Sequence, residues 1–185
     1  MDDLPSPREL AGAWQVGFRD PFGQTREAEF EQLTSWATHP EDTIRHFSGI
    51  GSYRRQCEVP ADWLRENRRV LLDLGRLWTV GEVLVNGRSL GVLWKPPYVV
   101  DVTDTVRAGE NRLEIRVANT WSNRLVGDAR LPPEERQTRT NVTHNNGVAW
   151  RDTPLLDSGL FGPVRIVPIE IVTVAVGQRQ PTARP

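Results

Sequence analysis

The sequence predicts an all-β protein built as a β-sandwich. Three observations support this fold class: apolar and polar residues mostly alternate, turn residues recur at short intervals, and helical patterns are few and short. Alternation with a period of two is typical of half-buried strands. Roughly eight or more short strands with close turns favour a sandwich, and 185 residues fit one domain.

The first predicted strands are Trp14–Phe18, Ala28–Leu33 and Gly51–Val59. The third of them contains the single cysteine, Cys57, which rules out an intramolecular disulfide. No recognisable base lies beside this thiol, so we expect it to be buried and inert. The segment Pro60–Asn67 could then form two helical turns, because a proline is tolerated at the first helical position.

The middle of the chain contains the strongest hairpin signal. Asn86 and Gly87 separate two apolar runs, Glu82–Val85 and Ser89–Leu93. An Asn-Gly pair supplies the two positive φ angles that a type I′ turn requires, so the sequence predicts a tight hairpin here.

Two further strands show clean alternation, and a turn at Ala108–Asn111 precedes the second of them. The apolar residues of the first are Val70, Leu72 and Leu74, and those of the second are Leu113, Ile115 and Val117.

The last predicted strands are Val164–Val167 and Ile169–Val176, which we expect Pro168 to separate because proline cannot donate to a strand ladder. Between about 123 and 162 the alternation lapses into a polar stretch, in which Pro133–Arg136 could form one helical turn. Loops of this length are usually functional or mobile. We expect one sandwich domain over 1–185, with an ordered core of about 8–177 and Pro-rich tails.

The charge and hydropathy of the chain exclude several classes of protein. The 23 basic and 24 acidic residues give a net charge of −1, which argues against a nucleic-acid partner. No apolar run is long enough to cross a membrane. The start, Met1–Pro7, lacks the basic and apolar regions of a signal peptide. The sequence leaves the localisation open.

Catalytic motifs are missing from the sequence, which contains no nucleophile elbow, zinc-protease helix motif, Walker loop or dinucleotide fingerprint. We therefore predict that the chain is not an enzyme. A small free-standing polysaccharide-degrading enzyme is a less favoured alternative, and its acid–base candidates would be His46, His144, Tyr98 and Lys95. These histidines and His39 show no metal-ligand spacing.

Two aromatic and polar segments, Trp94–Tyr98 and Asn119–Arg124, follow predicted strands. A sugar offers CH groups to an aromatic ring and hydroxyls to amides and guanidiniums. If the strand ends meet, these segments would form a shallow binding site on the rim of the sandwich. The predicted ligand-binding residues are Trp94, Lys95, Tyr98, Trp121, Asn123 and Arg124.

Charge and packing leave two interpretations of these segments open. Lys95, the only lysine, and Arg124 would suit an acidic sugar such as a uronate, because both supply charge-assisted hydrogen bonds. Alternatively, Trp94 and Trp121 are core residues, and Lys95 pairs with a nearby carboxylate.

Several segments together resemble the sugar-binding domain of family 2 glycoside hydrolases. They are Tyr53–Pro60, Val70–Gly75, Glu82–Gly87, Leu90–Gly91, Asp101–Thr103 and Gly109–Val117. Others are more similar to the β-sandwich region of family 106 α-L-rhamnosidases: Phe47–Gly49, Gly91–Tyr98, Asn123–Asp128 and Ser158–Val164. The segment Glu134–Asp152 departs from both, so its role is left open.

The resemblance implies a galactose-binding-like jelly roll without the catalytic barrel of such enzymes, and no family catalytic residue has a match here. It also implies a possible structural calcium ion, whose ligands the sequence does not reveal. We expect a non-catalytic carbohydrate-binding module that binds plant or bacterial polysaccharide. The alternative is a structural accessory domain that packs on a catalytic barrel and binds no sugar.

Overall fold

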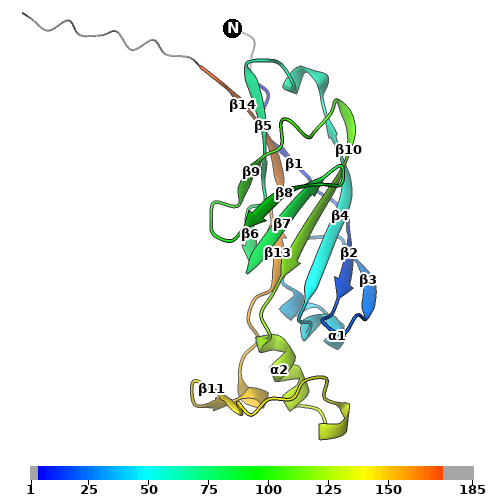
Figure 1. Cartoon of the computed structure of the whole chain (residues 1–185), viewed down its shortest axis with the longest axis vertical. Coiled ribbons are helices and arrows are strands. Elements are labelled where there is room, and N and C mark those ends of the chain that lie inside the picture. Colours follow the sequence, from blue (N-terminus) through cyan, green and yellow to red (C-terminus); the bar gives the residue numbers. More distant parts are fainter. Residues whose placement is uncertain (1–3, 173–185) are drawn as a thin grey trace, which may run out of the picture.

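The computed structural model describes residues 4–172 and confirms the all-β sandwich (Figure 1). In chain order the strands are β1 Arg8–Glu9, β2 Trp14–Arg19, β3 Thr25–Phe30, β4 Ile50–Val59, β5 Arg68–Asp73, β6 Arg76–Trp78, β7 Val80–Val85, β8 Arg88–Leu93, β9 Val99–Asp101, β10 Gly109–Ala118, β11 His144–Asn145, β12 Val148–Ala149, β13 Gly159–Gly162 and β14 Arg165–Glu170. The helices are α1 Asp42–Arg45 and α2 Ser122–Ala129, and single 3-10 turns cover Trp36–Thr38, Ala61–Trp63, Pro133–Glu135 and Trp150–Asp152.

A six-stranded antiparallel sheet forms one layer, in the order β3-β2-β4-β10-β7-β8. A four-stranded sheet, β1-β14-β5-β9, forms most of the other layer, and β6 pairs with β13 beside it. The predicted hairpin joins β7 to β8, with positive φ angles of 52° at Asn86 and 83° at Gly87. This is the backbone that the Asn-Gly pair predicts.

The core between the layers is centred on two stacked aromatic rings. Trp36 and Tyr53 are fully buried, and their ring centroids lie 6.3 Å apart at an angle of 13°. The Trp36 indole N–H donates to the Tyr53 hydroxyl, which also accepts from the Leu160 amide at 3.0 Å. Burial raises the pKa of Tyr53, which keeps the phenol neutral.

Residues 119–158 form a lobe below the sandwich, as Figure 1 shows for α2 and the β11–β12 hairpin. Asn119 anchors the start of this lobe, because its amide donates to the Phe47 carbonyl at 2.8 Å and accepts from the Gly49 amide at 3.0 Å. Gly127 of α2 packs on His46, where an added Cβ would lie 2.7 Å from the His46 side chain. Helix α2 therefore needs glycine at this contact.

The structure corrects three expectations from the sequence. The polar stretch after Asn123 contains α2, which was not predicted. Pro168 does not separate two strands: it lies inside β14, which pairs with β5 there and has no second neighbour beyond Ile166 among the described residues. The segment Pro60–Asn67 forms one 3-10 turn instead of two helical turns. The part of the last predicted strand beyond 172 lies outside the described residues.

Candidate functional site

The first predicted binding segment, Trp94–Tyr98, forms the turn from β8 to β9. Trp94 is 70% exposed, and the Lys95 ammonium lies 5.2 Å from the centre of its ring. No described carboxylate lies within ion-pair distance of Lys95. Tyr98 is half-buried and packs against the core. Trp94 is thus a surface residue, and Lys95 contacts an aromatic ring instead of an acid.

The second predicted segment begins α2, and its three candidate residues have different surroundings. Trp121 is 47% exposed. Asn123 is buried, and both ends of its amide hydrogen-bond the Leu156 backbone, at 2.7 and 2.8 Å. Arg124 is largely buried 3.8 Å from Asp128 in an ion pair, and burial lowers its pKa. In this conformation Trp121 is the one exposed residue of the three.

The two predicted segments start at the same end of the large sheet but then diverge. Leu93, which ends β8, and Val117 of β10 both pair with Gly81. The chain after Leu93 crosses to the other sheet, whereas the chain after β10 enters the lobe (Figure 1). The hollows that contain Trp121 or Arg124 include none of Trp94, Lys95 and Tyr98. The shared rim site stays a prediction.

Trp121 lies in a hollow that we name the Trp121 hollow, with a volume of about 390 Å³. Phe22, which is 58% exposed, lines the same hollow from the turn between β2 and β3. The Asp20 carboxylate fixes this turn by accepting from the amides of Phe22 and Gln24, at 2.9 and 2.8 Å. The remaining lining residues are Leu125, Gln137, Thr138, Arg139 and Thr140. Two exposed aromatic rings therefore face a set of polar and cationic groups.

A larger hollow of about 630 Å³ lies next to it in the lobe, and we name it the Trp150 hollow. The Trp150 indole donates to the Val142 carbonyl at 2.8 Å, which fixes the ring. Arg136, Arg139 and Arg151 also line this hollow. Because Arg139 and its neighbours line both hollows, one segment of chain separates them.

Asp128 holds that separating segment in place from α2. Its Oδ2 atom accepts hydrogen bonds from the amide of Thr138, at 2.7 Å, and from the Thr138 hydroxyl. Its Oδ1 atom is buried without a hydrogen bond, 3.8 Å from Arg124. The Asp128 carboxylate is therefore paired with the Arg124 cation and accepts two hydrogen bonds from Thr138. It contributes to both hollows by holding Thr138, which lines them, in position.

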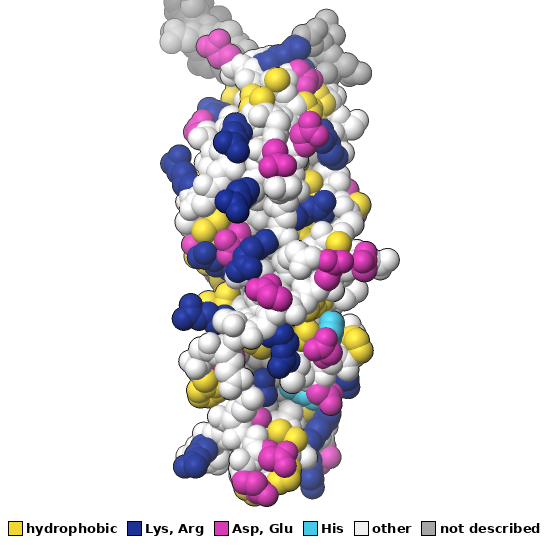
Figure 2. All heavy atoms as spheres, turned by 90° about the vertical axis from the view of Figure 1, so that its right-hand side faces the viewer, with side chains coloured by type: hydrophobic (Ala, Val, Ile, Leu, Met, Phe, Trp, Pro, Cys, Tyr) yellow, Lys and Arg dark blue, Asp and Glu magenta, His cyan; other side chains and the backbone are white. Residues whose placement is uncertain are grey.

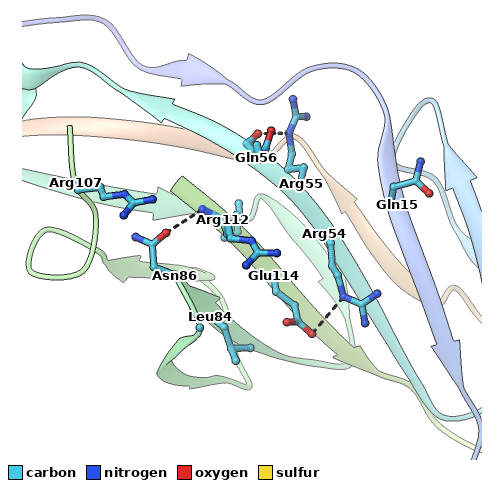
Figure 3. Close-up of a pocket in the computed structure, with 11 residues that line it drawn as sticks. Gln15, Arg54, Arg55, Gln56, Leu84, Asn86, Arg107, Arg112 and Glu114 are labelled. Carbon is cyan, nitrogen blue, oxygen red and sulfur yellow. Dashed lines mark hydrogen bonds and ion pairs between the residues drawn. The ribbon is translucent and has the colours of Figure 1, made fainter. Parts of the chain in front are cut away.

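A third hollow, of about 760 Å³, lies on the outer face of the large sheet (Figure 3). Register places Gln15, Arg54 and Glu114 side by side on β2, β4 and β10. Figure 3 shows Arg54 and Glu114 pointing toward each other, with Nε and Oε1 3.8 Å apart. Arg116 continues the network, at 2.9 Å from Glu114 and 3.2 Å from Glu82. The view in Figure 2 shows basic and acidic side chains interspersed on the right-hand side of Figure 1.

Sequence reasoning missed Phe22, Arg139 and Trp150 as candidate binding residues. Trp150 stands among threonines, asparagines and arginines, which is the same aromatic and polar mixture that singled out Trp121. That signal was available, but it lay in the Glu134–Asp152 segment, whose path in space the sequence did not define. Phe22 gave no signal, because only the folded β2–β3 turn brings it to α2.

Residues 4–172 contain no group of three or more His, Cys, Asp or Glu side chains that could hold a metal ion, so calcium stays an expectation from the resemblance. Within the same residues, no helix is long and apolar enough to span a bilayer. Cys57 is buried, as expected, and burial raises the pKa of its thiol.

Comparison with known proteins agrees with the fold and with the sequence resemblance. Residues 50–157 match the model of the glycosyl hydrolase 2 galactose-binding domain-like family. A protein of Formosa agariphila, provisionally named as a beta-glucuronidase, is 37% identical over 90% of this chain. The structure of a rhamnosidase from Novosphingobium sp. PP1Y is 36% identical over 91% of this chain, with a TM-score of 0.76.

A beta-glucuronidase of an uncultured Clostridium species shares the fold, with a TM-score of 0.62 over 92% of this chain and 20% identity. The chain spans only 16% of the length of the Formosa protein and 16% of the rhamnosidase. It therefore corresponds to a non-catalytic domain of larger glycoside hydrolases. With more than half of its length matched by the family model, the chain belongs to the glycosyl hydrolase 2 galactose-binding domain-like family.

Proposed function

We propose that the chain is a carbohydrate-binding accessory domain of a glycoside hydrolase and that it binds sugar in the lobe. The observation that supports this most is the Trp121 hollow, in which Phe22 and Trp121 expose their rings beside Arg139 and Gln137. Exposed aromatic rings are enriched at binding surfaces, and here polar groups around them can take up hydroxyls. Affinity for a single oligosaccharide should be weak, at about −4 to −8 kcal/mol.

Affinity electrophoresis on a panel of plant and bacterial polysaccharides tests the proposal, with isothermal titration for any oligosaccharide that retards the protein. Trp121→Ala should abolish most of the retardation. Trp78→Ala is the matched control, because Trp78 is 46% exposed, almost the same as Trp121, and lies on β6 outside the lobe. Wild-type protein that binds no polysaccharide in the panel at millimolar oligosaccharide would overturn the function.

Trp94→Ala separates the lobe from the rim turn. If this variant loses binding while Trp121→Ala keeps it, the sugar is bound at the turn of Trp94, Lys95 and Tyr98. That result would retain carbohydrate binding and reject the lobe as its place.

A second candidate function is an accessory domain that packs on a catalytic domain and binds no sugar itself. It is favoured by the small share of the relatives that the chain spans and by apolar side chains exposed on the lobe, namely Leu131, Val142, Val148 and Leu156. This function predicts that Val148→Asp leaves the isolated chain folded and weakens its association with the rest of a longer parent protein. Unchanged association would count against it.

A further inference from the structure

Three arginines of the Trp150 hollow have no acidic partner within ion-pair distance among the described residues. Among residues 4–172, no carboxylate lies within 4 Å of the guanidinium groups of Arg136, Arg139 and Arg151. On the large sheet, by contrast, Arg54 and Arg116 each contact two glutamates. Three like charges around one hollow repel each other unless an anion lies between them.

The acidic residues near the hollow do not neutralise these arginines. Asp128 lines the hollow, but its carboxylate forms an ion pair with Arg124, and its Oδ2 atom accepts a hydrogen bond from Thr138. Glu134, Glu135 and Asp152 are close in sequence, and the structure places none of them in an ion pair with the three guanidinium groups.

The arginines of the hollow also retain free donors. The Arg136 Nε–H donates to the Leu131 carbonyl at 3.0 Å, which leaves its terminal nitrogens free. The side chains of Arg139 and Arg151 make no hydrogen bond within the described part of the chain. Guanidinium groups bind carboxylate and sulfate oxygens with charge-assisted hydrogen bonds, often two at once.

We propose that the Trp150 hollow binds the anionic group of an acidic oligosaccharide, a carboxylate or a sulfate ester, with the Trp150 ring beside the sugar. This inference rests on the proposed function and specifies the ligand class for the lobe. The arginines bind the anion, and the Thr140 hydroxyl, which accepts from the Val142 amide and keeps its own proton, can donate to a sugar hydroxyl.

The hollow on the sheet is the main competitor for an anion, because four arginines line it (Figure 3). The sheet hollow differs from the lobe in two ways: the Glu114 carboxylate lines it and pairs with Arg54, and no aromatic side chain lines it. Arg55 also donates to the backbone carbonyls of Leu10 and Ala11, and Arg107 donates to that of Glu110. Only the Arg112 guanidinium has no partner there among the described residues. The lobe is therefore the better anion site.

The test compares three probes of equal length: an oligogalacturonate, its methyl ester and a sulfated galactan oligosaccharide. Isothermal titration should show that the wild-type protein prefers an anionic probe to the neutral ester. Arg151→Gln should weaken binding of that anionic probe roughly tenfold, the effect of losing one charge-assisted hydrogen bond. Arg112→Gln, which removes the same charge from the sheet, should change it less than about twofold.

Preference for the oligogalacturonate would identify a carboxylate site, and preference for the sulfated probe a sulfate site. Equal binding of the ester, or equal loss in Arg151→Gln and Arg112→Gln, would overturn the inference. Binding of neutral sugar that depends on Trp121 but shows no preference for acid would leave the proposed function standing while this inference fails. If no sugar of any charge binds, the proposed function fails first and this inference with it.

Discussion

In the sandwich, the two sheets bury a dense set of aromatic and aliphatic side chains around Trp36 and Tyr53. In the lobe, Val126 is the one large apolar side chain that is fully buried within the described residues, and the other buried side chains are polar: Asn123, Asp128, Thr153 and Ser158. Hydrophobic burial is non-directional and stabilises the sandwich as a whole. The lobe depends instead on directional hydrogen bonds.

This difference shows how the protein separates stability from binding. Because polar contacts hold the lobe, Trp121 does not have to pack inside it and remains 47% exposed, and Trp150 lines a hollow. In the sandwich, Trp14, Trp36 and Trp63 are buried, whereas Trp78 and Trp94 are exposed. Within the described residues, every buried tryptophan therefore lies in the sandwich and none lies in the lobe.

The largest expected effect is on the sandwich. Trp36→Ala removes a fully buried ring and the hydrogen bond to Tyr53, so the free energy of unfolding should fall by about 3–5 kcal/mol. Trp121→Ala should change it by less than about 1 kcal/mol, because its side chain is half exposed. Urea unfolding followed by circular dichroism measures both. Equal losses in the two variants would remove the distinction between the regions.

A smaller and local effect is expected where the lobe meets α1. In Gly127→Ala the added Cβ would lie 2.7 Å from His46, and such overpacking typically costs about 1–3 kcal/mol. The lobe should loosen while the sandwich stays folded, so trypsin should cut faster between 130 and 151 while amide exchange in β4 and β10 is unchanged. Faster exchange throughout the sheets would show that the two regions unfold together.

The smallest expected effect is a pH dependence of the free energy of unfolding that arises from His46, the residue that contacts Gly127. Burial lowers the pKa of His46 below its usual 6.5, despite the hydrogen bond of its Nδ1 atom with the Asp42 carbonyl. As the pH drops through about 6.5, His46 takes up a proton in the unfolded chain before it does so in the folded protein. The contribution of His46 to the free energy of unfolding therefore falls with the pH in this range. Comparison of wild type with His46→Gln by urea unfolding at about pH 5 and 7 isolates this contribution. A variant with the same pH slope as wild type would contradict it.

Sequence reasoning predicted the sandwich better than the lobe, for a physical reason. Leu113, Ile115 and Val117 alternate because β10 buries one face, and this pattern is visible in any single sequence. In α2 the buried positions are Asn123, Val126, Gly127 and Asp128, which follow helical spacing but are mostly not apolar. A method based on hydrophobic periodicity therefore cannot detect this helix.

The candidate site was predictable only in part for the same reason. Trp121 gave a signal because an aromatic residue stood among amides and arginines. Asn123 gave the same signal, although its amide is fully used by Leu156. Residue type alone does not distinguish an amide that binds a ligand from one that binds the backbone.

The amide of Asn123 also has a consequence for how this family can vary. Its paired hydrogen bonds with Leu156 join positions 33 residues apart, so the chain between them is closed at its base independently of the sheets. The entropic penalty of closing such a loop grows by only about 0.6 kcal/mol for each doubling of its length. Insertions, deletions or wholesale exchange of the segment between α2 and Leu156 should therefore be tolerated. Different ligand-binding segments can therefore be placed between α2 and Leu156, in evolution or by design, without changes to the sequence of the two sheets.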